Sequence, residues 1–195
     1  MPAPAAPGDE DLMLAYAAGD AAAFDALYAR HKGGVYRCLL RQCHQGGVAD
    51  ELFQDVWMNL IRARASYVPT AKFTTWLYRL AHNRLIDYYR ASGQVTLVSA
   101  DDEAHADTIA ALPARHDDQP EQRAQTHELG ARLKRAVDAL PPVQREAFLL
   151  QQEGGMSLAE IAELTGAGIE TVKSRLRYAT TKLRGELFDI YEPER

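Results

Sequence analysis

Basic and hydrogen-bonding side chains recur along residues 169–178, and their spacing is typical of a helix that binds DNA. Ile169, Val172 and Leu176 repeat at helical spacing and would face a hydrophobic core. The positions between them hold Lys173, Ser174, Arg175 and Arg177. Cations bind DNA phosphates, and donors of this kind read base edges in the major groove. An ordinary helical hairpin with a solvated basic face would carry the same charges.

Residues 157–168 provide the elements that would position this helix. Ser157 followed by Glu160 is a capping box, in which the hydroxyl and the carboxylate each bond the other residue's backbone amide. Gly166 and Gly168 predict a tight turn, because glycine adopts positive φ readily. Cap, turn, apolar register and charge together predict a helix-turn-helix over 157–177 that binds duplex DNA.

The charge distribution is compatible with a nucleic-acid partner although the formal net charge is −5. Residues 93–127 contain seven acids and two arginines, a net charge of −5, which leaves the remainder formally neutral. Residues 169–184 contain five cations and one acid, a net charge of +4. Such asymmetry between segments is more informative about partners than the total.

The bulk composition indicates a soluble, folded protein. The chain of 195 residues is long enough for one sizeable domain or two small ones, and it has no apolar run of the ~18 residues that a membrane span needs. The N-terminal segment lacks the basic start and apolar core of a signal peptide. Two cysteines, Cys38 and Cys43, are too few for a disulfide framework, so we expect a cytoplasmic location.

Helical periodicity predicts an all-α fold of two small domains. The apolar patterns place helices at 9–18, 21–43, 48–65, 73–91, 128–140 and 143–152, followed by the helix-turn-helix and a last helix running towards residue 190. Residues 93–127 lack sustained periodicity and are too acidic to bury much surface. The expected organisation is a disordered tail (1–8), a first domain (9–92), a flexible acidic linker (93–127) and a second domain (128–191).

Two surfaces of the first domain have more than one interpretation. A compact patch near the start of the helix at 48–65 consists of Asp50, Glu51, Gln54 and Asp55. Acids there suit the positive end of a helix dipole, or they form a docking surface for a basic partner. The helix at 73–91 interleaves cations, an amide and aromatic rings, which suits single-stranded DNA. Taken alone, core aromatics with a solvated basic face explain that helix better.

Catalysis and metal binding find no support in the sequence. Cys38 and Cys43 are five residues apart, so they would not share a helix face, and no other Cys/His pair has metal-ligand spacing. The chain also has no phosphate-binding glycine loop, no nucleophile elbow and no catalytic constellation. We therefore expect a protein without a metal, without a cofactor and without catalytic residues.

Three stretches of the chain resemble the extracytoplasmic-function (ECF) sigma factors, group IV of the bacterial sigma-70 family. They are residues 50–57, residues 73–87, and residues 140–146 continuing to 171–176. Their order and separation fit the family from about residue 11 to residue 187. The resemblance implies a region 2 domain (9–92), a region 4 domain (128–191), and a linker that enters the RNA exit path of RNA polymerase.

The resemblance also implies roles for individual residues. Asp50, Glu51, Gln54 and Asp55 would dock on the β′ coiled coil of core RNA polymerase, and the β flap would be a second contact. The loop 66–72 would receive a flipped-out base of the promoter −10 element. The residues implied for −10 DNA are Tyr67, Lys72, Arg79, Asn83 and Arg90. Those implied for the −35 duplex are Thr171, Lys173, Ser174, Arg175, Arg177 and Tyr178, with Thr171 and Arg175 on phosphates.

Departures from the family pattern limit these implications. Arg79 and Leu80 stand where primary sigma factors carry paired tryptophans, so we expect weaker, promoter-restricted melting. Glu170 and Tyr178 replace a common glycine and a common basic residue, which leaves the −35 sequence open. The family also implies an anti-sigma factor as a partner. Two other classes of protein are alternatives: a helix-turn-helix regulator that does not join the polymerase, and an enzyme with an appended DNA-binding domain.

Overall fold

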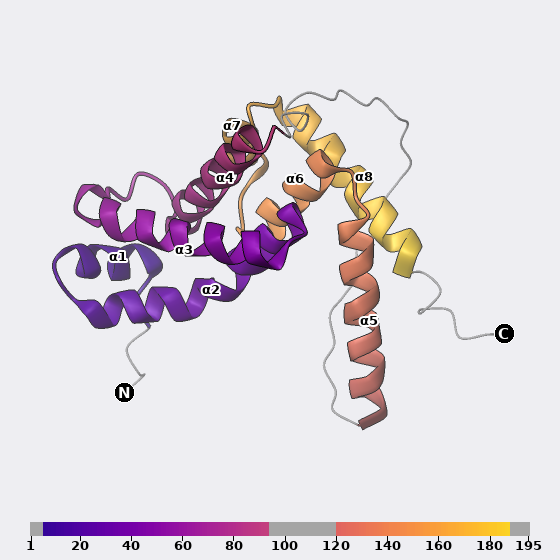
Figure 1. Cartoon of the computed structure of the whole chain (residues 1–195), viewed down its shortest axis with the longest axis horizontal. Helices are drawn as coiled ribbons and strands as arrows, with labels where there is room; N and C mark the ends of the chain where they lie inside the picture. Colours follow the sequence, from indigo (N-terminus) through magenta and orange to yellow (C-terminus); the bar gives the residue numbers. More distant parts are fainter. Residues whose placement is uncertain (1–5, 94–119, 188–195) are drawn as a thin grey trace. The chain divides into compact units, whose positions relative to one another are not determined.

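The computed structural model of the 195-residue chain describes residues 6–93 and 120–187, with the side chains of 120–127 excepted. Within these ranges the regular elements are helices: α1 (Asp9–Ala17), α2 (Ala21–Cys43), α3 (Gly46–Ala63), the short 3-10 helix η1 (Arg64–Ser66), α4 (Phe73–Ala91), α5 (Pro120–Asp138), α6 (Pro142–Gln152), α7 (Leu158–Thr165) and α8 (Ile169–Leu187) (Figure 1). The all-α fold expected from periodicity is confirmed.

The helix boundaries follow the sequence pattern closely, except at α5. This helix begins at Pro120, eight residues before the expected start at residue 128, so the C-terminal part of the predicted linker 93–127 is helical. Proline suits the first turn of a helix, where the backbone amide that it lacks would have no partner within the helix. An apolar stripe is not needed to extend a helix by two turns. Residues 94–119 of the predicted linker, the tail 1–5 and residues 188–195 lie outside the described part.

The chain forms two compact units. Among the described residues, the first unit comprises 6–93 and 149–167, and the second comprises 120–148 and 168–187. The first unit therefore contains the predicted region 2 domain together with a segment that includes α7. The predicted C-terminal domain, 128–191, is divided between the two units.

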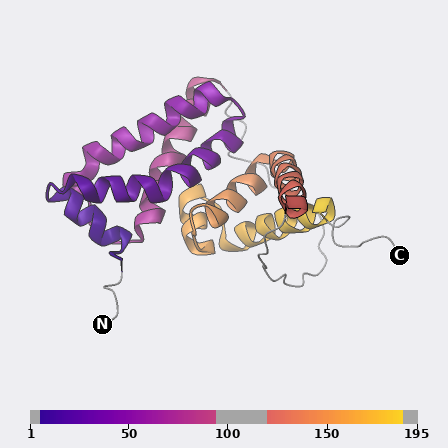
Figure 2. The ribbon, with the colours of Figure 1, turned by 90° about the horizontal axis from the view of Figure 1, so that it is seen from below.

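Helices α1 to α4 form the core of the first unit (Figure 2). Helix α1 packs against α2 and α4, α2 packs against α3, and α3 packs against α4. The largest fully buried side chains of these helices are Met13, Leu27, Val35, Leu39, Leu52, Val56, Leu60, Phe73, Leu77 and Tyr78. The Asp20 carboxylate accepts a hydrogen bond from the Ala22 amide at 3.0 Å and so caps the N-terminus of α2.

Residues 149–167 join the first unit through charged and polar contacts. The Arg37 guanidinium donates two hydrogen bonds, of 2.8 and 2.7 Å, to the Glu153 carboxylate. On α4, the Thr75 hydroxyl donates to Glu160 of α7, and the Arg79 guanidinium donates to Glu163 at 2.8 Å. Because Arg79 and Glu163 are both well exposed, that last pair contributes only about 0–1 kcal/mol.

The second unit is built on the packing of α5 against α8. Its buried side chains include Val137, Leu140, Ala147, Val172, Leu176, Ala179 and Leu183. The buried Arg145 donates to the carbonyls of Asp138 and Leu140, at 2.8 and 3.3 Å, and so satisfies acceptors at the C-terminal end of α5. Lys182 of α8 adds a hydrogen bond to the Ala139 carbonyl at 2.9 Å.

Membrane spans, metal sites and disulfides were the remaining questions that the sequence raised about the fold. No helix in the two described ranges combines the length and apolar character that crossing a membrane requires. In the same ranges, no three His, Cys, Asp or Glu side chains gather in an arrangement that would hold a metal ion. Cys38 and Cys43 are buried cysteines outside any disulfide, and the Cys43 thiol donates to the Gln45 carbonyl at 3.4 Å.

Candidate polymerase and nucleic-acid interfaces

The acidic patch lies on α3, beyond its first turn. Helix α3 begins at Gly46, so its first turn contains no acid, and the preceding Gln45 makes no side-chain cap. The favourable effect of a carboxylate at a helix N-terminus falls off within one turn. Dipole compensation therefore explains Asp50 and Glu51 poorly, and of the two interpretations that the sequence left open, docking gains support.

Members of the acidic patch differ in their surroundings. Glu51 and Gln54 are exposed, and Met58, one turn further along the same helix face, is 45% exposed. The Tyr36 hydroxyl bonds to Asp50, and this hydrogen bond is the main reason that the pKa of Tyr36 is raised. Asp55 accepts a hydrogen bond from Arg84 of α4 at 2.7 Å. The result is an exposed face with polar and apolar side chains and two tethered carboxylates at its sides.

Four of the five residues predicted to contact −10 DNA are exposed. Arg79, Asn83 and Arg90 of α4 are spaced by four and seven residues, so they lie on one face of the helix. Lys72 precedes α4 and is also exposed. The loop before it carries Val68, an apolar side chain that is 66% exposed. These side chains are accessible to a strand that runs along α4.

Tyr67, the fifth of these residues, is buried. Its side chain is only 8% exposed, and its ring lies against Trp76, with centroids 5.0 Å apart, and against Phe73 at 6.4 Å. Burial raises the pKa of the Tyr67 hydroxyl, and the nearby carboxylates of Glu10 and Asp9 raise it further. This position anchors the start of the loop from inside the domain, whereas the sequence suggested direct contact with DNA.

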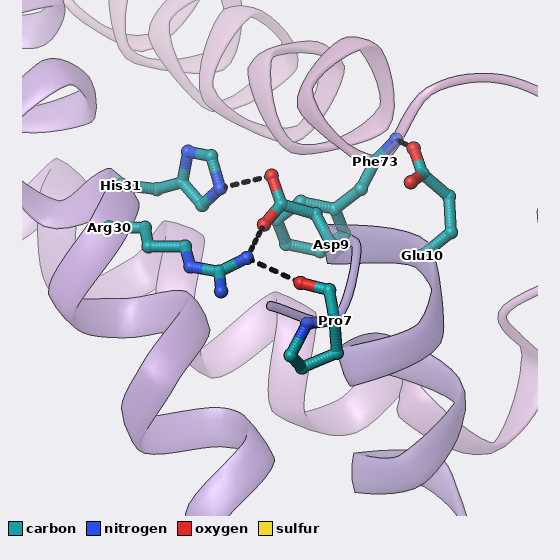
Figure 3. A network of polar contacts seen from close by, with 6 residues as sticks. All are labelled: Pro7, Asp9, Glu10, Arg30, His31 and Phe73. Atoms are coloured by element: carbon teal, nitrogen blue, oxygen red, sulfur yellow. Dashed lines mark hydrogen bonds and ion pairs between the residues drawn. The ribbon is translucent and has the colours of Figure 1, made fainter. Parts of the chain in front are cut away.

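A polar network that the sequence did not indicate connects α1 to α2 and α4 (Figure 3). Asp9 accepts a hydrogen bond from Arg30 at 2.7 Å and pairs with His31 at 2.7 Å. Glu10 accepts a hydrogen bond from the Phe73 amide, also at 2.7 Å. One signal was available in the sequence: Lys72, at the N-cap of α4, is a poor capping residue, so the helix needs an acceptor from elsewhere.

The capping box of the predicted helix-turn-helix is present in α7. The Ser157 hydroxyl accepts from the Glu160 amide at 3.3 Å, and the Glu160 carboxylate accepts from the Ser157 amide at 2.8 Å. Helix α7 ends at Thr165, and its C-cap residue Gly166 has a φ of 68°. Gly168 does not have a positive φ, so the left-handed conformation is needed at only one of the two predicted glycines.

Helix α8 presents the residues predicted to contact the −35 duplex. Lys173 is exposed and pairs with Glu170 at 3.4 Å. The Arg177 guanidinium lies over the Tyr178 ring, 5.2 Å from its centroid. The remaining predicted residues, all partly exposed, are Thr171, Ser174 and Arg175. All six are accessible to some degree on the surface of one helix.

The apolar side of α8 differs from the expectation at its first residue. Val172 and Leu176 are buried as predicted, but Ile169 is 52% exposed. Side chains in a helix lean towards its N-terminus, so the side chain of a first residue extends past the end of the helix. Ile169 therefore lies outside the hydrophobic core.

Two protein-family profiles match this chain, one in its N-terminal half and one in its C-terminal half. The profile described as Sigma-70 region 2 matches residues 27–94, which cover most of α2 to α4. The profile described as Sigma-70, region 4, matches residues 130–183, which cover most of α5 to α8. Together they include the acidic patch, the exposed face of α4 and the basic residues of α8.

Similar proteins extend the match over most of the chain. The ECF RNA polymerase sigma factor SigE of Mycolicibacterium smegmatis is 33% identical over 93% of this chain and 70% of its own length. The RNA polymerase sigma factor CarQ of Myxococcus xanthus is 31% identical over 86% of this chain and 91% of its own length.

Solved structures share the fold. CnrH, in complex with the cytosolic domain of CnrY, matches with a TM-score of 0.59 and 23% identity over 94% of this chain and 99% of its own. The sigma factor RpoE from Bartonella quintana, in complex with the anti-sigma factor NepR, matches with a TM-score of 0.58 and 23% identity over 85% of this chain and 96% of its own. With both sigma-70 profiles and these relatives in agreement, the chain belongs to the family of ECF sigma factors.

Proposed function

We propose that the protein binds core RNA polymerase and directs it to promoters, reading the −35 element as duplex and the −10 element as a melted strand. The observation that carries this proposal is the exposed face of α3. It displays Glu51, Gln54 and Met58, and the needs of the helix itself do not account for it. A protein that only binds duplex DNA has no use for such a face in a separate domain.

Core docking is assigned to this face of α3. Hydrogen-bonding groups around a central apolar side chain are typical of specific protein interfaces. The patch carries negative charge at Asp50, Glu51 and Asp55, so the complementary surface is basic. By family analogy we assign that surface to the β′ coiled coil of the polymerase, with the β flap as a contact of region 4.

Strand reading is assigned to the loop 67–72 and to α4. Arg79 and Arg90 supply cations for a phosphate backbone, and Asn83 supplies an amide that bonds base edges. The Arg79–Glu163 pair is weak enough for DNA to displace it. Since Tyr67 is buried, we assign it to the support of the loop and leave the DNA contacts to Lys72 and the three residues of α4.

Duplex recognition is assigned to α8. Lys173, Arg177 and their neighbours place donors and cations along one helix, as a recognition helix in a major groove requires. Arg177 is stacked on Tyr178, which limits its freedom before DNA arrives and lowers the entropic cost of ordering it. Tyr178, which replaces a basic residue common in the family, thus helps to hold the Arg177 guanidinium in place for DNA.

Regulation by an anti-sigma factor is part of the proposal. The solved structures of similar fold include one bound to a protein described as an anti-sigma factor. A partner of this kind would cover the polymerase-binding and DNA-binding faces. We further propose that the protein acts in the cytoplasm, where core polymerase and promoters are found, and that it performs no catalysis of its own.

The test is reconstitution with core RNA polymerase from the native cell. We expect the protein to co-elute with core polymerase in size-exclusion chromatography and the complex to make promoter-specific run-off transcripts from a library of promoter sequences. A protein that binds promoter duplex but not core polymerase would be a helix-turn-helix regulator instead. A protein that binds core polymerase but leaves transcription non-specific would contradict the assignment of α4 and α8.

A further inference from the structure

The loop 67–72 is tied to α1 at the point where α4 begins, although Glu10 of α1 lies 63 residues before Phe73 in the chain. At the end of the loop, the Glu10 carboxylate accepts a hydrogen bond from the Phe73 amide at 2.7 Å. Phe73 is the first residue of α4, and Lys72 before it makes no side-chain cap. Glu10 therefore does for α4 what an N-cap residue normally does, but from another helix.

At the start of the loop, Tyr67 is buried beside the same helix. Its ring is held between Phe73 and Trp76 of α4. The carboxylates of Glu10 and Asp9 are close enough that, after burial itself, they contribute most to the raised pKa of Tyr67. Burial of the Tyr67 ring therefore anchors the start of the loop, and the hydrogen bond from the Phe73 amide to Glu10 anchors its end.

The first turn of α1 is itself held firmly. Asp9 bonds Arg30 and His31 of α2 with both of its carboxylate oxygens, each at 2.7 Å. Arg30 also donates to the Pro7 carbonyl at 3.0 Å, which fixes the backbone just before the helix (Figure 3). Glu10 is therefore an acceptor at a set position, and α4 with its preceding loop is aligned to it.

We propose that Glu10 is a positioning residue for the reading of the −10 strand, and that it sets the conformation of the loop 67–72 through the amide of Phe73. This inference rests on the proposed function of that loop. Glu10 itself lies on α1 and is not among the residues assigned to DNA. Its effect is on selectivity: a loop with an unanchored end samples more conformations and discriminates less between bases.

Three substitutions at Glu10 separate this role from a general structural one. Glu10→Asp keeps the charge but shortens the side chain by one methylene, so the carboxylate no longer reaches the Phe73 amide. Glu10→Gln removes the charge but keeps an oxygen that accepts the bond. Glu10→Ala removes both. Asp11→Asn is the matched control, because Asp11 is an exposed acid in the same turn of α1.

The measurement uses holoenzyme formed from the full-length protein and core RNA polymerase, with a promoter library randomised across the −10 segment. Sequencing of the run-off transcripts gives the preference for the favoured base at each position. We expect Glu10→Asp and Glu10→Ala to lower the strongest −10 preference about fivefold, as for the loss of one helix cap. Glu10→Gln and Asp11→Asn should stay near the wild type, and the affinity for core polymerase should be the same in every variant.

The outcomes for the Glu10 variants distinguish failure of the inference from failure of the proposed function. If Glu10→Asp keeps the wild-type preference, or if Glu10→Gln loses as much as Glu10→Asp, the hydrogen bond to Phe73 does not position the loop and the inference is overturned. If the wild-type holoenzyme itself shows no base preference in the −10 segment, the proposed function of the loop fails, and the inference fails with it. Hydrogen exchange at the Phe73 amide, faster in Glu10→Asp than in the wild type, would confirm that the bond was lost.

Discussion

Replacement of Asp55 by asparagine separates polymerase docking from the stability of the first unit. Asp55 pairs with Arg84 at 2.7 Å, and the two side chains are 46% and 34% exposed. An ion pair with that exposure contributes about 0–1 kcal/mol to folding. Asp55→Asn and Arg84→Gln both break the pair, so each should lower the melting temperature only slightly.

The two variants should differ sharply in their affinity for core polymerase. Removal of one partner of a charged hydrogen bond at an interface costs at least ~2 kcal/mol, which is about thirtyfold in affinity. We therefore expect Asp55→Asn to weaken core binding about thirtyfold. Arg84→Gln leaves the carboxylate in place and should change binding less than about threefold, the equivalent of ~0.6 kcal/mol.

The assay is a fluorescence-anisotropy titration of labelled full-length protein with core polymerase, beside thermal unfolding of each variant. Asp87→Asn is a suitable control, because Asp87 is an exposed acid of α4 that faces Arg90 at 3.9 Å. If Arg84→Gln weakens core binding as much as Asp55→Asn does, Asp55 acts by holding α3 to α4. In that case the assignment of Asp55 to the docking surface is refuted.

Three further predictions concern α7, its N-cap residue Ser157, and α8. Lys173→Ala with Arg177→Ala should leave core binding unchanged but weaken binding to −35 duplex, whereas Arg175→Ala should reduce the slope of log affinity against log salt by about 1, since each phosphate contact contributes ~0.9. Unchanged salt dependence in Arg175→Ala would exclude a phosphate contact for that residue. Ser157→Ala should lower the free energy of unfolding by about 1 kcal/mol, measured by urea denaturation, because α7 loses its cap. The pKa of Glu160 is lowered to about 2 by its hydrogen bonds from Thr75 and then from Ser157. Its contribution to stability should therefore be complete above pH ~4.5 and disappear as the pH falls towards 2; a difference between wild type and Glu160→Gln that stays constant over this range would contradict it.

Local sequence was sufficient to predict the helices and much of what they carry. The capping box at Ser157 and Glu160, the left-handed turn at Gly166 and the buried positions Val172 and Leu176 all follow from rules that act within a few residues. The exposed cations of α8 follow from the same periodicity. The family resemblance added roles to these residues, but their placement needed only the period of a helix.

Contacts between segments that are distant in the sequence could not be predicted from local sequence patterns. Burial of Tyr67 depends on Phe73 and Trp76 folding back over it, and the tethering of Asp55 depends on Arg84, which lies 29 residues away. A polar residue in a loop has the same local sequence whether it faces DNA or the core. Which of these occurs is decided by the packing of α1, α3 and α4, and no periodic pattern records that packing.

The hydrogen bond from the Phe73 amide to Glu10 shows most clearly which features local sequence determines and which depend on tertiary structure. The sequence determines that α4 starts near residue 73 and that its N-cap position holds a lysine, which leaves the first amides without a local acceptor. The acceptor lies 63 residues earlier in the chain. Only the tertiary structure could identify it, because a buried amide must find a partner, and the partner is whichever carboxylate the folded chain brings within reach.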